Sequence, residues 1–317
     1  MDLETIKQHI GDVLKETDFK GIGERKVGKV RDVYISPDKI ILISTDRHSS
    51  FDRIIAHIPF KGEILNQISA FWFDQTKDII QNHVVSIPDP NVLVAKKCQP
   101  LPIEAIVRGY ITGVTSTSLW THYQAGKRDF GNFVLPEGMK KNQKLPKPVF
   151  TPSTKFEEHD RTLSPQEIVA EGLMEKELVD KVEQKAIELF IRGQEIALSH
   201  GLILVDTKYE FGLDEKGELT LIDEIHTPDS SRYWKAGSYD ERFNKGEDPE
   251  YFDKEFLRIW FKDNCDPYKD EKLPEAPVEM VAELSRRYIE IYETITGEKF
   301  VHDFSQPILA RIEKNLK

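Results

Sequence analysis

The stretch of residues 201–234 places the tightest constraint on the fold. It holds two runs rich in β-branched and aromatic residues, 202–211 and 218–225, and the turn-forming residues 214–217 separate them. This pattern predicts two strands joined by a tight turn. The first run begins with four consecutive apolar residues, which favours a buried central strand over an edge strand. We therefore expect this hairpin to lie inside a sheet.

The hairpin also carries charged residues that a buried strand rarely holds. Alternate side chains of a strand share one face, so we expect Asp206, Lys208 and Glu210 to lie together. On the return strand, Asp223 and Glu224 are expected on opposite faces. A solvated hairpin face is the alternative, and it is the commoner situation for any single carboxylate. Several carboxylates on a buried strand need a neutralising cation, and Mg²⁺ shared with substrate phosphates suits them. The sequence therefore predicts a metal–phosphate site.

The charge of the chain limits its partners. Its 317 residues include 44 Lys and Arg against 55 Asp and Glu, which gives a net charge of −11. Nucleic acids demand a basic surface, so no nucleic acid is expected as the main partner. Two cysteines indicate neither a disulfide framework nor a cysteine metal cluster. The chain shows no long apolar run and no basic–apolar leader pattern, so we expect a cytoplasmic protein with no membrane partner.

A basic, glycine-punctuated sequence near the N-terminus suggests an anion site. Residues 21–35 hold three glycines among Lys26, Lys29 and Arg31. The backbone amides and basic side chains of such a hairpin can lie over a triphosphate, although glycine is also common in ordinary hairpin turns. Residues 44–53 mix hydroxyl, acidic and basic groups, which suits either a loop that closes over a polar ligand or a plain surface turn.

Hydrophobic periodicity outlines the rest of the chain. Helices are expected over residues 2–16, 62–82, 172–200, 277–295 and 305–316. Pro100 and Pro102 interrupt two further strands and suggest a lobe boundary. Lys96 and Lys97 end an apolar strand, where one of them can point inward. Residues 235–276 are rich in Asp, Lys, Gly and Pro, which is typical of a surface excursion with one short helix.

Several segments, in this order, together resemble one family, the SAICAR synthetases. They are GKVRDVY (28–34), EAIVRGYITG (104–113), FTPSTK (150–155) followed by His159 and Asp160, GLILVDTKYEFG (201–212) and LIDEIHTPDSSRYW (221–234). The match spans most of residues 20–235, and its last two motifs are specific. Members of this family are phosphoribosylaminoimidazole-succinocarboxamide synthases, and the chain is similar to the family's long form.

The resemblance implies an α+β fold with two lobes. Residues 1–106 are expected to form an N-terminal ATP-binding lobe built on an antiparallel sheet. Residues 107–317 are expected to form a mixed α+β lobe that binds substrate and metal, with 235–276 as a surface insertion. By the same resemblance, ATP lies in a kinase-like or ATP-grasp-like cleft.

The resemblance also implies a reaction in de novo purine biosynthesis. ATP phosphorylates the carboxylate of 5-amino-1-(5-phosphoribosyl)imidazole-4-carboxylate (CAIR), which gives an acyl phosphate and ADP. The amine of L-aspartate then displaces phosphate and forms the amide, SAICAR. The implied cofactors are ATP and Mg²⁺, the partners are small molecules, and the protein is a monomer or a small homo-oligomer.

Site residues follow from the same resemblance. Those implied for ATP are Lys29, Arg31, Lys97 and Glu210. Those implied for the ribonucleotide are Arg108, Ser116, Lys155, Asp160, Ser231 and Arg232. Lys208 and Asp206 are the implied catalytic residues, and Asp206 either orients Lys208 or accepts a proton from the amine. Glu210 and Asp223 are the implied Mg²⁺ ligands. The family often has serine where this chain has Val114, so the phosphate contact is assigned to Ser116.

Two other functions use the same features. A kinase for a small molecule or a lipid headgroup also needs a glycine-rich hairpin, an inward lysine and carboxylates on a hairpin. A nucleotide-binding regulatory module needs ATP binding without turnover. Release of phosphate that depends on aspartate distinguishes the ligase from the kinase, because a kinase keeps the phosphate on its product.

Overall fold

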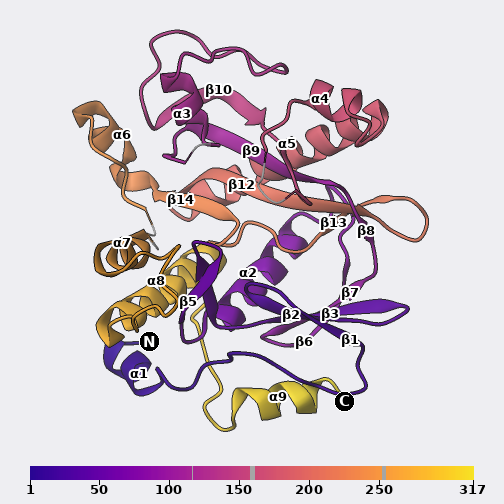
Figure 1. The fold of residues 1–317 in the computed structure, drawn as a ribbon, viewed down its shortest axis with the longest axis vertical. Coiled ribbons are helices and arrows are strands. Elements are labelled where there is room, and N and C mark those ends of the chain that lie inside the picture. The colour runs from indigo at the N-terminus through magenta and orange to yellow at the C-terminus, as the bar shows by residue number, and fades with distance from the viewer. Residues whose placement is uncertain (116, 158–160, 252–254) are drawn as a thin grey trace. The chain divides into compact units, whose positions relative to one another are not determined.

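The computed structural model describes residues 1–115, 117–157, 161–251 and 255–317 (Figure 1). Contacts between Cα atoms divide the chain into two compact units. The first unit comprises Met1–Phe71, Val84–Lys97 and Phe252–Lys317, and the second comprises Trp72–His83 and Cys98–Tyr251. The lobes at 1–106 and 107–317, as ATP-binding and substrate-binding parts, stay a prediction.

The first unit contains a five-stranded antiparallel sheet with the strand order β1-β2-β3-β7-β6 (Figure 1). Its strands are β1 (Glu24–Val27), β2 (Arg31–Ile35), β3 (Lys39–Ser44), β6 (Val84–Asp89) and β7 (Val92–Lys96). A separate hairpin pairs β4 (Arg47–Ser50) with β5 (Arg53–His57). The helices of this part are α1 (Leu3–Gln8), most of α2 (Lys61–Gln75), α7 (Glu255–Asn264), α8 (Val278–Thr296) and α9 (Ile308–Asn315).

The second unit contains a seven-stranded sheet around β12 (Leu202–Leu213). β12 pairs antiparallel with β9 (Ile103–Ile111), β13 (Leu219–Ile222), β14 (Ser231–Lys235) and β8 (Gln99–Pro100). β10 (Gln143–Phe150) and β11 (Ser153–Thr154) pair with β9. The helices of this unit are α3 (Leu119–Gln124), α4 (Pro165–Ala170), α5 (Lys176–Ser199) and α6 (Ala236–Lys245).

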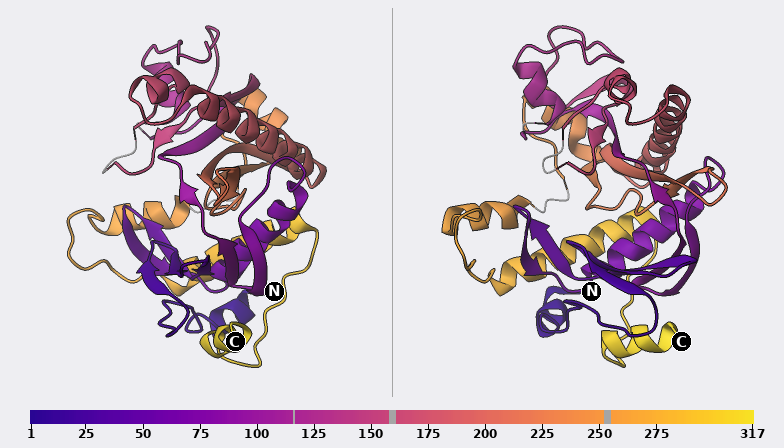
Figure 2. Two further views of the ribbon diagram at one scale, coloured as in Figure 1. Left: turned by 90° about the vertical axis from the view of Figure 1, so that its right-hand side faces the viewer. Right: turned by 45° about the vertical axis from the view of Figure 1, so that its right-hand side comes forward.

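Helix α5 covers one face of this sheet, along β12, β9 and β10 (Figure 2). Its buried stripe includes Val182, Ala186, Leu189, Phe190 and Gly193, the spacing of an amphipathic helix. Leu204 packs against Gly193 of this helix, whereas Ile203 and Val205 pack in a cluster with Tyr110, Trp234 and Tyr239. Burial of both sets explains why β12 begins with an unbroken apolar run. The prediction of a buried central hairpin is confirmed.

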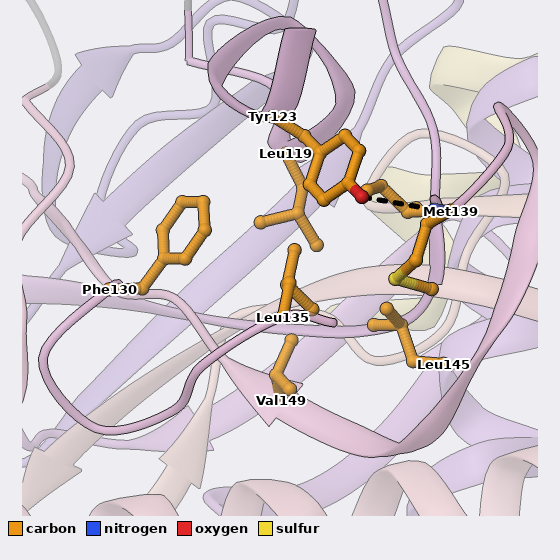
Figure 3. Close-up of a cluster of buried hydrophobic side chains, with 8 residues drawn as sticks. Leu119, Tyr123, Phe130, Leu135, Met139, Leu145 and Val149 are labelled. Atoms are coloured by element: carbon orange, nitrogen blue, oxygen red, sulfur yellow. Dashed lines mark hydrogen bonds between the residues drawn. The ribbon is translucent and has the colours of Figure 1, made fainter. Parts of the chain in front are cut away.

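A smaller apolar cluster closes the region between α3 and β10 (Figure 3). Its buried members are Ile111, Leu119, Tyr123, Phe130, Leu135, Met139, Leu145 and Val149. The Tyr123 hydroxyl accepts a hydrogen bond from the Met139 backbone at 3.0 Å and donates one to the Pro136 carbonyl at 2.8 Å. The cluster therefore ties the long connection between β9 and β10 to the sheet.

Three local predictions were wrong. The N-terminal helix was expected over residues 2–16 but ends at Gln8, because the Leu14 amide donates to the Asp46 carboxylate instead of continuing a helix. Residues 44–53 were expected as a loop or surface turn, but Arg47–Ser50 forms β4 and the residues from Ser44 to His48 are buried. Within 235–276, helix α6 was not expected.

Two further differences concern where elements end. Helix α2 was expected to reach residue 82 but ends at Gln75, and the chain from Gln81 to His83 pairs with Leu221 of β13 instead. Strand β13 ends at Ile222, so the expected alternation of Asp223 and Glu224 along a strand was wrong. Asp223 has a φ of 68°, which turns the chain away from the sheet.

In the described part of the chain, we find no helix that has both the length and the apolarity to cross a membrane.

Candidate functional site

The pairing of β9, β12 and β14 brings charged side chains from three strands to one face of the second unit's sheet. Asp206 on β12 lies opposite Arg108 on β9 and opposite Arg232 on β14. Two residues further along β12, Lys208 lies opposite Ile106, and Glu104 of β9 lies within its reach. The register of the strands therefore determines which charges meet.

Asp206 lies between two guanidinium groups. Its carboxylate is 3.5 Å from Arg108 Nη1 and 3.7 Å from Arg232 Nε. Asp206 is 7% exposed, and its Oδ2 atom has no hydrogen-bond partner among the described residues. Oδ2 is the oxygen that lies 3.5 Å from Arg108. Because it makes no hydrogen bond, it remains able to accept one from a ligand.

Arg108 is held rigidly in this arrangement. Its Nε donates to the Thr151 hydroxyl at 2.9 Å, and 9% of the residue is exposed. Burial lowers the pKa of Arg108, and the Asp206 carboxylate opposes that shift. Arginine keeps its charge under these conditions. The arrangement thus presents a fixed cation beside the more exposed Arg232, whose side chain is 40% accessible.

Lys208 and two acids form the next part of the cluster. The Lys208 ammonium lies 2.5 Å from Glu104 Oε1 and 3.9 Å from Glu210 Oε1. Burial favours its neutral form, but the Glu104 and Glu210 carboxylates, together with Asp223, outweigh burial and raise the pKa of Lys208. Lys208 is therefore a charged group at neutral pH and not a free amine base. The contacts confirm that Asp206, Lys208 and Glu210 share a face.

Glu210 is the acid of the cluster that lies near two lysines and a second carboxylate. It forms an ion pair with Lys155, which follows β11, and its side chain is 17% exposed. Burial raises the pKa of Glu210, the neighbouring Asp223 raises it further, and Lys155 and Lys208 oppose the shift. Two acids that repel each other in a buried setting are a suitable place for a cation.

These two acids fit a divalent cation. Oxygen ligands suit Mg²⁺, which usually takes one or two carboxylates and completes its shell with water and substrate phosphates. In residues 1–115, 117–157, 161–251 and 255–317, no cluster of three or more His, Cys, Asp or Glu side chains could hold a metal. Glu210 and Asp223 would then need oxygens from a substrate to complete a metal shell.

The start of β14 carries the predicted site residues Ser231 and Arg232. The Ser231 hydroxyl is 2.7 Å from the Thr207 hydroxyl of β12, and the Ser231 amide donates to the Thr227 carbonyl at 2.8 Å. Arg232 follows directly and faces Asp206. Thr207 alternates with Asp206 and Lys208 along β12, so this contact places the Ser231 side chain on the opposite side of the strand from Arg232. The role of Ser231 in binding a phosphate stays a prediction.

The other residues singled out in the sequence belong to the first unit or lie outside the described residues. Lys29 is exposed in the turn between β1 and β2 and pairs with Asp52 at 2.6 Å. Arg31 begins β2, and Lys97 is exposed after β7. The roles of these three residues in ATP binding stay predictions. Ser116 and Asp160 lie outside the described residues.

The sequence analysis missed Glu104. This residue is the second of β9, the strand that contains Arg108, and it accepts hydrogen bonds from Lys208 at 2.5 Å and from Ser153 at 3.3 Å. A signal was present, because Glu104 and Arg108 are four residues apart in a strand and therefore share a face. The pairing of that strand with β12 could not be predicted from the sequence pattern.

With the fold and the charged cluster described, comparison with known proteins identifies the family of the chain. A family model described as SAICAR synthetase matches residues 24–275. The chain belongs to the SAICAR synthetase family.

Relatives of known name support the assignment. The chain is 56% identical over 296 residues to the phosphoribosylaminoimidazole-succinocarboxamide synthase of Legionella pneumophila (strain Paris), covering 93% of this chain and 95% of that protein. The chloroplastic enzyme of that name from Arabidopsis thaliana is 54% identical over 318 residues, covering 99% of this chain and 77% of the plant protein.

Solved structures agree in fold. The SAICAR synthase of Saccharomyces cerevisiae, solved in complex with SAICAR, superposes with a TM-score of 0.78 at 34% identity, covering 91% of this chain and all of that one. A SAICAR synthetase in complex with ADP gives a TM-score of 0.66 at 27% identity, covering 88% of this chain and all of that one. These similarities confirm the predicted family and the α+β fold.

Proposed function

We propose that the chain is an ATP-dependent ligase that joins L-aspartate to the carboxylate of CAIR and forms SAICAR, ADP and phosphate in de novo purine biosynthesis. The observation that carries the proposal is the cluster on β9, β12 and β14, where three cations and three acids meet on one face of a sheet, with Asp223 close enough to Glu210 to raise its pKa. Family membership and the names of the relatives support it. The complexes with SAICAR and with ADP identify the kinds of ligand that related proteins bind.

The cations of the cluster bind the ribonucleotide in this proposal. Arg108, Arg232 and Ser231 hold its phosphate and imidazole groups, and Ser116 is proposed as a further contact. Arg108 supplies a charge fixed by Thr151, and Arg232 supplies a more accessible one. Local cations of this kind explain how a chain of net charge −11 binds a polyanion.

ATP and Mg²⁺ complete the proposed site. Glu210 and Asp223 hold Mg²⁺, which neutralises charge on the ATP phosphates during transfer. Lys155, which pairs with Glu210 in the structure, then becomes available to a substrate oxygen. Lys29, Arg31 and Lys97 are proposed to contact ATP, in the kinase-like cleft that the family resemblance implies.

The chemistry requires positioning and charge neutralisation more than covalent catalysis. A carboxylate oxygen of CAIR attacks the γ-phosphorus of ATP, the bond to ADP breaks, and an acyl phosphate forms. The aspartate amine then attacks the acyl carbon and expels phosphate, which retains the attacking oxygen. Lys208 stabilises the negative charge on the reacting oxygens, and Asp206 Oδ2, which makes no hydrogen bond in the structure, accepts a proton from the amine or orients Lys208.

The proposal extends to the setting of the enzyme. It acts in the cytoplasm on small molecules as a monomer or small homo-oligomer, and it binds neither nucleic acid nor membranes. The negative net charge supports the absence of a nucleic-acid role.

A coupled ADP-release assay tests this function directly. With ATP, Mg²⁺ and CAIR, we expect rapid ADP and phosphate release only when L-aspartate is present, with SAICAR detected by mass spectrometry. Removal of Mg²⁺ with EDTA should abolish release, and added Mg²⁺ should restore it. Transfer of phosphate to a stable product in the absence of aspartate would identify a kinase and reject the ligase.

Arg232→Ala tests the ribonucleotide contacts. We expect the KM for CAIR to rise about tenfold or more, because a hydrogen bond to a charged group contributes about 1.5–3 kcal/mol, while kcat changes less. Lys245→Ala is the control, since it removes an exposed positive charge from α6, the helix that follows β14. Steady-state kinetics with varied CAIR measure the effect, and an unchanged KM in the Arg232 variant would remove this residue from the site.

A further inference from the structure

His226 is fully buried within the second unit, and we call the residues that contact it its pocket. The residue is 0% exposed, and its Nε2 atom is 2.5 Å from the hydroxyl of Tyr209 on β12. The Tyr233 hydroxyl donates to the His226 carbonyl at 2.7 Å. The Trp72 ring meets the imidazole edge-on, with centroids 4.7 Å apart. Both the side chain and the backbone of His226 are therefore held in place.

Helix α5 closes the pocket through a glycine. A Cβ atom at Gly193 would lie 2.4 Å from His226 Cε1 and 2.8 Å from Leu204 Cδ2, distances that no side chain tolerates without movement. The pairing of β12 with β14 shifts register between Leu204 and Asp206. An irregularity of this kind allows Leu204 and Tyr209 both to face α5, while Asp206 and Lys208 face the charged cluster.

The backbone on either side of His226 carries unusual conformations. Asp223 has a φ of 68° and His226 has a φ of 50°, in a region that residues other than glycine seldom adopt. Such conformations persist only where the surroundings enforce them. The hydrogen bonds to Tyr209 and Tyr233 supply that enforcement at His226.

The Tyr209–His226 hydrogen bond links the two segments that carry the acids proposed to hold Mg²⁺. Tyr209 immediately precedes Glu210 on β12, and His226 follows Asp223 by three residues in the turn after β13. The same turn continues into Thr227, whose carbonyl accepts the Ser231 amide. This buried contact therefore joins the turn to the strand.

We propose that His226 is a positioning residue, which holds the turn bearing Asp223 against β12 so that Asp223 and Glu210 together can bind a divalent cation. The inference rests on the proposed function, because the turn that His226 holds in place matters only if Asp223 and Glu210 bind the metal of the ligase. His226 does not touch substrate; it acts through the turn. Burial lowers the pKa of His226 to about 3, so the imidazole is neutral at neutral pH and its contact with Tyr209 does not change there.

The test measures binding of Mn²⁺, a spectroscopic substitute for Mg²⁺, to the protein saturated with ADP. Tyr209→Phe keeps the ring and removes the hydroxyl that meets His226. Gly193→Ala pushes His226 from the side of α5. Outer partners that orient metal ligands typically change metal affinity by about 10–100-fold when mutated, so we expect Mn²⁺ to bind about tenfold more weakly in each variant by electron paramagnetic resonance.

Gly237→Ala is the matched control. Gly237 also lies in a helix of the second unit, and a Cβ atom there would meet nothing within 4 Å. We expect wild-type Mn²⁺ affinity in this variant. Circular dichroism identifies the temperatures at which every variant is folded, and binding is measured there. If Gly193→Ala does not fold, the Mn²⁺ affinity of Tyr209→Phe alone tests the inference. We expect ADP binding without metal to be unchanged in Tyr209→Phe, and excess Mg²⁺ to restore its kcat.

The outcomes separate this inference from the proposed function. In one outcome, the wild-type protein makes SAICAR and binds Mn²⁺ with ADP, and the folded Tyr209→Phe variant binds Mn²⁺ equally tightly. This outcome would overturn the role of His226 but leave the proposed function standing. Wild-type protein that binds no Mn²⁺ with ADP and releases no ADP with CAIR and aspartate would overturn both. A Tyr209→Phe variant that loses thermal stability but keeps Mn²⁺ affinity would show that the pocket is structural only, and would also overturn the inference.

Discussion

Replacing Lys208 with methionine is expected to lower kcat for SAICAR formation by about 10²–10³-fold, the usual effect of removing one group that stabilises charge in a transition state. Methionine keeps much of the length of the side chain but removes the ammonium that lies 2.5 Å from Glu104 and 3.9 Å from Glu210. The loss should appear in kcat more than in the KM for CAIR, because Arg108 and Arg232 remain. Steady-state ADP release measures it.

Lys216→Met is the control for this change. Lys216 is exposed in the turn of the same hairpin, and its replacement removes one positive charge without entering the cluster. We expect wild-type kinetics from this variant. Since Lys208 is 38% exposed, its methionine variant should still unfold cooperatively. A Lys208→Met enzyme with wild-type kcat would exclude the ammonium from the chemistry.

Asp32→Asn is expected to destabilise the first unit by about 3–5 kcal/mol, the usual cost of removing one partner from a buried ion pair. The Asp32 carboxylate is fully buried and accepts hydrogen bonds from Arg47 at 2.8 Å and from the Thr17 amide at 2.6 Å. Arg47 also donates to the carbonyls of Gly28 and Lys29, so the variant should loosen the turn proposed to contact ATP. Urea unfolding at pH 7 measures the loss.

The pH dependence of this effect has a defined sign. Burial raises the pKa of Asp32, but hydrogen bonds from Thr17 and Arg47 outweigh burial and hold the pKa below its ordinary value of 3.8. Between the folded and unfolded pKa values the unfolded chain binds more protons, so stability rises with pH there. The difference in the free energy of unfolding between wild type and Asp32→Asn should be largest above the pKa of Asp32 in the unfolded chain. It should shrink as the pH falls through the pKa of Asp32 in the folded protein. The exposed Asp38→Asn change is the control, and an equal loss in both variants would contradict the account.

The central hairpin and its charges could be predicted because the signals are local. The apolar run that opens β12 indicated burial, and the alternation of Asp206, Lys208 and Glu210 placed them on one face. Motifs in the right order also indicated the family, and the family model confirmed it. The periodicity of the sequence and the identity of its residues were therefore enough to predict β12, the main strand of the site.

The remaining features depend on tertiary contacts that no local pattern contains. The contacts of His226 with Tyr209, Tyr233 and α5 join segments that lie apart in the chain. Glu104 joins the cluster only because β9 pairs with β12. The early end of α1 depends on Asp46, which lies far along the chain and accepts the Leu14 amide.

Oxygen-18 transfer from CAIR is the most direct test of the central claim, that this enzyme activates a carboxylate with ATP before aspartate attacks. CAIR labelled with ¹⁸O in its carboxylate is turned over with ATP, Mg²⁺ and L-aspartate, and the released phosphate is analysed by mass spectrometry. An acyl phosphate predicts that each phosphate carries one oxygen from the carboxylate. Unlabelled phosphate, formed at the wild-type rate together with SAICAR, would contradict the mechanism.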